Sequence, residues 1–257
     1  MLKITQNPEV DNSTDEVSDV VGRFRAGYMV DDEPVSLTAF RVTTGDESLA
    51  KKVASPKGLG LNPDMGEDAG PQEWDAAGED FIEVFTKATD VEVVLDSKDA
   101  YQSSLIRRDK DDDFMYATDG EVITAVGEDY EDEFEVGEAD PQAGEGLATR
   151  KKKARQNKGS KPDIRIRFRL VEHPEWGVFE YRTGGWSLVT HSPEDKLQAL
   201  GDGPIRATLK LIRSKNRRRA YTFPELAVHG LEADVQEKAA VKPKVTGTRK
   251  KSPIPAE

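Results

Sequence analysis

Residues that could act as nucleophiles or general bases are sparse in this chain. The sequence contains no cysteine, which removes thiol chemistry, disulfides and cysteine-ligated zinc sites, and it has no Gly-x-Ser-x-Gly elbow. Three histidines, His173, His191 and His229, lie in or beside expected strand edges, with no acid and nucleophile arranged around them. We interpret them as surface or turn residues, with a hidden general base as the alternative. The sequence favours a protein that is not an enzyme.

The acidic run DKDDDF, which begins at Asp109, is the segment that most resembles a metal-binding loop. Asp109, Asp111 and Asp113 occupy the first three ligand positions of an EF-hand loop. The sixth position, which requires glycine for the sharp turn, is Phe114, and the twelfth, which requires glutamate, is Gly120. We predict a solvated charge run here, with a loose cation site as the alternative.

The glycine-rich stretch GLGLNPDMG, which begins at Gly58, is the only candidate for a phosphate-binding loop. Such a loop needs a preceding strand that leads into a helix, or a Gly-Lys-Ser/Thr continuation. The sequence provides neither. We therefore expect no cofactor, no metal and no small-molecule substrate.

Residues suited to a macromolecular partner are a tryptophan in a long loop and two clusters of positive charge. Aromatic and arginine side chains contribute most of the binding energy at protein interfaces. From expected exposure and charge we predict partner contacts by Trp74, Lys151, Lys152, Lys153, Arg155, Arg217, Arg218 and Arg219. For the tryptophan, a role in the core is the alternative.

The segment IRIRFRL offers a second kind of surface, in which Arg165, Arg167 and Arg169 alternate with apolar residues. A basic strand with aromatic residues nearby is typical of nucleic-acid binding. However, the chain has a net charge of −12, and outward arginines of a half-exposed strand are often paired with carboxylates. We expect direct contact with DNA to be weak.

Composition and charge favour a soluble protein with both ordered and loose segments. Apolar residues make up 36% of the 257 residues and charged residues 33%. No apolar run approaches the ~20 residues needed to cross a bilayer, and the first residues lack the apolar region of a signal peptide. The absence of cysteine suits a reducing cytoplasm, where we expect the protein to reside.

The charge is divided unevenly along the chain. Residues 1–149 carry 12 basic and 37 acidic residues, whereas residues 150–257 carry 25 basic and 12 acidic residues. Two explanations fit this division: the halves neutralise each other in the fold, or they form two different partner surfaces.

Alternation of apolar and polar residues predicts an α+β fold, mainly antiparallel strands with a few short helices. Strands are expected over 21–30, 36–44, 80–88, 91–96, 103–108, 113–118, 121–126, 164–170, 207–214 and 219–228. Asp119-Gly120 predicts a hairpin turn, and Gly184-Gly185 predicts another, between strands 177–183 and 186–191. Short helices are expected after the capping residue Asp46 and over 193–200.

Changes in composition divide the chain into five predicted segments. These are a flexible acidic arm (1–20), an N-terminal α+β module (21–126), an acidic then basic loop or linker (127–162), a C-terminal antiparallel β module (163–231) and a disordered basic tail (232–257). Pro224 cannot donate to a ladder, so its strand is expected at an edge of the sheet.

Several of these segments together resemble a known family. LTAFRVTTGDESLAKKVAS, EWDAAGEDFIEVFTKATDVEVVL, DFMYATDGEVI, PDIRIRFRLVEHPEWGVFEYRTGGWSLV and ATLKLIRSKNRRRAYTFPELAV occur in this order. Their order and spacing, over about residues 21–230, resemble actinobacterial phage proteins that include recombination directionality factors, the excision factors of large serine integrases.

The resemblance implies a regulator of prophage excision that performs no chemistry of its own. Such a factor binds the integrase on its attachment sites and redirects its coiled-coil arms. Recombination between attL and attR is then favoured over recombination between attP and attB. The alternatives are a phage nucleic-acid-binding protein of replication or recombination, and a phage structural or assembly protein.

One departure from the family concerns cysteines that many relatives carry near the Asp-Gly hairpin and before the IRIRFRL strand, where they suggest a bound metal. Here those places read Tyr116-Ala117-Thr118 and Lys158-Gly159-Ser160-Lys161-Pro162. The charged segment 127–162 lies in the same region and is a candidate replacement for that feature.

Overall fold

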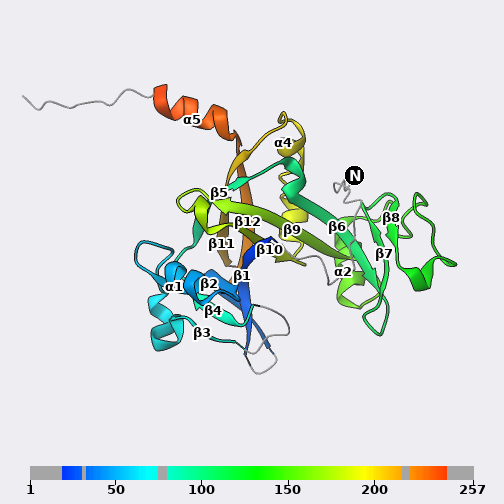
Figure 1. Cartoon of the computed structure of the whole chain (residues 1–257). Coiled ribbons are helices and arrows are strands. Elements are labelled where there is room, and N and C mark those ends of the chain that lie inside the picture. Colours follow the sequence, from blue (N-terminus) through cyan, green and yellow to red (C-terminus); the bar gives the residue numbers. More distant parts are fainter. Residues whose placement is uncertain (1–18, 31–32, 75–79, 216–219, 242–257) are drawn as a thin grey trace, which may run out of the picture.

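A computed structural model describes residues 19–30, 33–74, 80–215 and 220–241 of the protein. Within these residues twelve strands join in one sheet, which confirms the α+β prediction (Figure 1). The strands are β1 Val20–Val30, β2 Glu33–Thr44, β3 Gln72–Glu73, β4 Ile82–Phe85, β5 Asp90–Leu95, β6 Tyr101–Arg108, β7 Phe114–Thr118, β8 Ile123–Val126, β9 Lys161–Leu170, β10 Val178–Thr183, β11 Ile205–Lys215 and β12 Ala220–Leu231.

The sheet branches at β9. Its main path runs in the order β12-β11-β5-β9-β10-β1-β2-β4-β3, and a branch of β6, β7 and β8 leaves from β9. Strands β5 and β6 both pair antiparallel with the same side of β9, because only a short 3-10 turn, η2 Lys98–Ala100, separates them in the chain. Every pairing in the sheet is antiparallel except that of β1 with β10. Figure 1 shows the β6–β8 branch on the opposite side of the molecule from β2, β3 and β4.

The main core lies on the face of the sheet that carries the apolar residues of β9. The predicted alternation along β9 is confirmed, since Ile164, Ile166, Phe168 and Leu170 are all buried. At the centre the ring of Phe24 on β1 lies 5.3–5.4 Å from the rings of Phe40, Phe168 and Phe179, in edge-to-face contacts. Residues from both halves of the chain therefore share the main core, and a smaller cluster of Leu37, Ala69 and Phe85 lies apart from it.

Helices are short and lie around the sheet. They are α1 Glu47–Ala54, α2 Leu147–Arg155, α3 Ser187–Thr190, α4 Glu194–Gln198 and α5 Glu232–Val241. The cap predicted for α1 is confirmed, because Asp46 accepts hydrogen bonds from the backbone N–H of Ser48 and of Leu49, at 2.7 and 3.2 Å. The helix α4 is also where the sequence predicts one, and β12 is an edge strand, as Pro224 indicates.

The hairpin predicted at Gly184-Gly185 is wrong. Residues 187–190 form α3, and no strand follows β10 at this point. The two sides of β10 are already paired, one with β9 and the other with β1, so no edge is left for a returning strand. The hairpin predicted at Asp119-Gly120 is confirmed by the pairing of β7 with β8.

The predicted division into modules does not correspond to separate sheets. Strands β9 and β10 of the second module are inserted between β5 and β1 of the first, and pair with both. The predicted linker 127–162 contains α2 and several buried residues. Residues 232–241 of the predicted tail form α5, and residues 242–257, like residues 1–18 of the predicted arm, lie outside the described residues.

Candidate partner interface

Each of the three histidines contacts a neighbouring aromatic ring or a polar group. His173 stacks on Trp176 with ring centres 4.0 Å apart, and its Nε2 lies 3.1 Å from the carbonyl of Lys57. His191 stacks against Phe223, and Nε2 of His229 lies 2.7 Å from the hydroxyl of Thr208. Their interpretation as turn and surface residues agrees with these contacts.

The run that begins at Asp109 forms a turn stabilised by its own carboxylate. Asp109 accepts hydrogen bonds from the backbone N–H groups of Asp111 and Asp113, at 2.8 and 2.9 Å, and from the hydroxyl of Tyr130 at 2.9 Å. The Tyr130 hydrogen bond is the largest cause that lowers the pKa of Asp109. Across the described part of the chain no three histidine, aspartate or glutamate side chains gather as a metal site.

Trp74 directly follows β3, the last strand of the main path. Its ring lies against the face of the sheet that carries Arg25 and Arg41. The guanidinium groups of Arg25 on β1 and Arg41 on β2 lie 4.9 and 4.6 Å from the centre of its ring. These two arginines stand directly opposite each other in the β1–β2 register, an arrangement that is unfavourable between like charges. The π face of the indole attracts both cations and offsets part of this repulsion.

Two carboxylates complete the surroundings of Trp74. Arg41 donates to Glu83 at 2.6 Å, and Asp80 lies 3.9 Å from Arg25. Burial, followed by the charge of Arg41, lowers the pKa of Arg25. The tryptophan lies outside any helix or strand, as predicted, but it is held against the sheet and is only partly exposed.

A half-exposed phenylalanine adjoins this tryptophan. The backbone N–H of Trp74 donates to the carbonyl of Phe81 at 2.9 Å, which continues the antiparallel pairing of β3 with β4 and makes the two residues cross-strand neighbours. The side chain of Phe81 is 51% exposed. We call Trp74, Phe81 and Arg25 the Trp74 patch. It combines a fixed aromatic ring, an exposed apolar ring and a cation, which is the composition typical of interface anchors.

The residues of the predicted basic cluster at 151–155 have different surroundings on α2. Lys153 forms an ion pair with Glu145, and Lys151 lies 6.0 Å from the ring centre of Trp186. Lys152 and Arg155 are exposed, and neither has a carboxylate within 4.0 Å in the described ranges. The other predicted cluster, Arg217–Arg219, lies outside the described residues.

The arginines of β9 are paired with carboxylates, as the alternative interpretation of this strand expects. Arg165 lies 3.4 Å from Asp163. Arg167 lies 3.8 Å from Glu180, and Arg169 lies 3.5 Å from Asp96. This face is largely neutralised, which weakens the case for a nucleic-acid-binding β-surface.

A buried ion pair organises the segment between β8 and β9. Arg150 of α2 is 2% exposed and donates to Asp140 at 2.9 Å. Its other terminal nitrogen donates to the carbonyls of Gly120 and Gln142, at 2.8 and 2.6 Å. The side chain of Gln142 in turn accepts from the backbone N–H of Ser160 at 2.9 Å. These bonds fasten the charged segment to the sheet.

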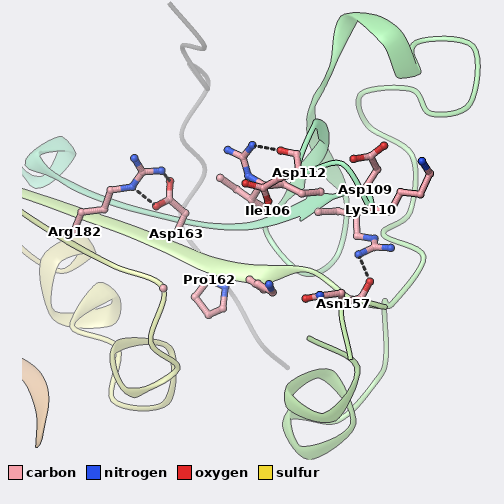
Figure 2. Close-up of a pocket in the computed structure, with 13 residues that line it drawn as sticks. Ile106, Asp109, Lys110, Asp112, Asn157, Pro162, Asp163 and Arg182 are labelled. Atoms are coloured by element: carbon pink, nitrogen blue, oxygen red, sulfur yellow. Dashed lines mark hydrogen bonds and ion pairs between the residues drawn. The ribbon is translucent and has the colours of Figure 1, made fainter. Parts of the chain in front are cut away.

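A cleft of about 370 Å³ lies between the β6–β7 turn and the start of β9 (Figure 2). Arg107 donates to the carbonyl of Asn157 at 2.8 Å, and Arg108 donates to the carbonyl of Asp112 at 2.7 Å. On the far wall Arg182 forms two hydrogen bonds with Asp163, at 2.6 and 3.0 Å. No sequence pattern indicates this cleft, because it forms only when β9 pairs with β6 and brings distant loops together.

Comparison with known protein families gives one match. The model of the Gp3-like family, described as recombination directionality factor-like, matches residues 21–229. The chain belongs to this family. The expected resemblance to recombination directionality factors is thereby confirmed, over nearly the expected range. No solved structure matches the chain. In the described parts of this Gp3-like protein no helix is long and apolar enough to cross a membrane.

Relatives were expected to carry cysteines at two places in the chain. In this Gp3-like protein, side-chain hydrogen bonds from one segment connect those two places instead. The first place ends at Thr118, two residues before Gly120, whose carbonyl accepts from Arg150. The second contains Ser160, whose N–H donates to Gln142. Both bonds come from the segment 140–150. The candidate replacement predicted for segment 127–162 is therefore consistent with these contacts.

Proposed function

We propose that this Gp3-like protein binds a large serine integrase and switches it from recombination of attP with attB to recombination of attL with attR. Membership of a recombination directionality factor-like family over residues 21–229 is the observation that carries the proposal. The protein acts as a binding regulator and performs no chemistry itself.

The switch requires a difference in binding energy between two arrangements of the integrase. Changing a 1:99 preference to 99:1 takes about 5.5 kcal/mol of differential binding. A few well-placed anchors in an interface of ordinary size supply energies of this order. The factor must therefore contact a surface whose position differs between the two arrangements, which we take to be the coiled-coil arms.

We assign the main protein contact to the Trp74 patch. The ring of Trp74 contacts two guanidinium groups that hold it against the sheet, so little side-chain entropy is lost when a partner covers it. Phe81 adds apolar surface that is exposed in the isolated protein. Arg25 can exchange its distant contact with Asp80 for a carboxylate of the partner.

The test is a recombination assay with purified integrase and the four attachment sites. The wild-type protein is expected to activate attL × attR recombination and to suppress attP × attB recombination. The variants W74A and F81A are expected to need at least tenfold more protein for the same effect. The variant Y221A is a matched control, because Tyr221 is 45% exposed on β12, at the opposite end of the strand order.

Two results would contradict the proposal at different levels. If the wild-type protein changes neither reaction, the proposed function is wrong. If it changes both reactions while W74A, F81A and Y221A behave alike, the function stands and the assignment of the Trp74 patch is wrong. Thermal unfolding of each variant shows whether a loss of activity reflects a loss of folded protein.

A further inference from the structure

Three cations that line the cleft have no acidic partner among the residues that the structure describes. Arg107 and Lys161 both line it, and the register of β6 with β9 places Lys161 opposite Ile106, the residue before Arg107. Of the carboxylates that the structure describes, none lies within 4.0 Å of Arg107, Arg108 or Lys161. We call Arg107, Arg108 and Lys161 the cleft cations.

The cleft cations are held in position by backbone groups. Arg107 and Arg108 each donate one guanidinium N–H to a backbone carbonyl oxygen, at 2.8 and 2.7 Å (Figure 2). In the described ranges of the chain, their other N–H donors have no carboxylate to bind. A guanidinium anchored in this way loses less conformational entropy when it binds an anion than a free side chain does. The arrangement is that of a preformed anion site.

The charges around the cleft decide which of its cations can accept an anion. Exposed Arg155 and Lys158 flank Asn157 in the chain and add positive charge next to Arg107. Asp109 and Asp112 also line the cleft, beside Arg108, and oppose anion binding there. Arg182 contributes no free charge, because Asp163 neutralises it through two hydrogen bonds.

We propose that the cleft cations and their neighbours Arg155 and Lys158 contact phosphates of the attachment-site DNA once the protein is bound to the integrase. This inference rests on the proposed function, since the integrase is what brings a polyanion to the cleft. Arginine and lysine are the residues that most often bind DNA phosphates. The protein alone binds DNA weakly, because its net charge is −12 and acidic residues line part of the same cleft.

The test measures binding of labelled full-length protein to the integrase, with and without attL DNA, at several salt concentrations. The test variant is R107Q/K161Q. The control is K52Q/K196Q, which removes the same charge from exposed lysines on α1 and α4, away from the cleft in Figure 1. Each lost phosphate contact reduces the slope of log affinity against log salt by about 0.9.

For R107Q/K161Q we expect the salt slope on the integrase–DNA complex to fall by about 2, with at least tenfold weaker binding at 0.15 M salt. Its affinity for the integrase without DNA should equal that of the wild type. The control should behave as the wild type in both measurements.

Three outcomes would overturn the DNA contact. Equal weakening with and without DNA would mean that the cleft cations bind carboxylates of the integrase. An unchanged slope and affinity would mean that they bind no anion in the complex. Failure of the wild-type protein to bind the integrase at all would overturn the proposed function as well, which separates it from the first two outcomes.

Discussion

Breaking the buried ion pair between Arg150 and Asp140 should strongly reduce the stability of the protein, because water cannot replace either partner. Their side chains are 2% and 0% exposed. The variant R150M keeps much of the apolar bulk and removes the charge. Asp140 is then left as a buried, unpaired carboxylate, and the carbonyls of Gly120 and Gln142 lose their donor.

Removal of one partner from a buried pair costs about 3–5 kcal/mol. The comparison variant is K153M, which breaks the neighbouring pair of Lys153 with Glu145. Those side chains are 40% and 22% exposed, so the expected cost is at most about 1 kcal/mol. The double variant R150M/D140L removes both charges and should recover part of the stability lost in R150M.

Urea unfolding followed by circular dichroism measures the free energy of unfolding of each variant. Hydrogen exchange at the amide of Ser160 reports whether the loss is local, because this amide depends on Gln142 in the same segment. If R150M unfolds within about 1 kcal/mol of the wild type, and its Ser160 amide exchanges no faster, the ion pair does not hold this segment.

Three further predictions concern other parts of the fold. The variant D46A should lower the free energy of unfolding by about 1 kcal/mol, because two N–H groups of α1 lose their acceptor; thermal unfolding measures this. The variant F24A should cost about 3–5 kcal/mol in urea unfolding, because Phe24 is 1% exposed and contacts three other rings. The variant Y130F should raise the pKa of Asp109, measured by carboxyl NMR titration. Since the folded state lowers this pKa, the stabilisation by Asp109 is present above its ordinary value and is lost as pH falls through the lowered value. Y130F should therefore reduce the dependence of stability on pH in the acid range, and an unchanged titration would contradict this.

Local patterns in the sequence predict most of the strands and two of the helices. The alternation along β9 and the cap at Asp46 are determined by neighbouring residues, and both predictions are confirmed. The hairpin at Gly184-Gly185 fails for a nonlocal reason. Whether a second strand can follow β10 depends on whether β1, far away in the chain, already occupies the free side.

The candidate site shows the same division. Trp74 is recognisable as unusual from the sequence, but its cation–π contacts with Arg25 and Arg41 depend on the register of β1 with β2. The segment 127–162 has the composition of a loose linker. A single buried arginine, Arg150, ties it to the sheet, and composition averages cannot detect one such residue.

The parallel pairing of β1 with β10 has a consequence for the synthesis of the protein. Val20 emerges from the ribosome early, but its partner Val178 is made only after most of the chain. Until then β1 has one open edge, and the rings of Phe168 and Phe179 that pack on Phe24 do not yet exist. Topologies dominated by such distant contacts fold slowly. Premature termination before β10 should therefore leave no folded fragment, so that only the nearly complete product can engage a partner.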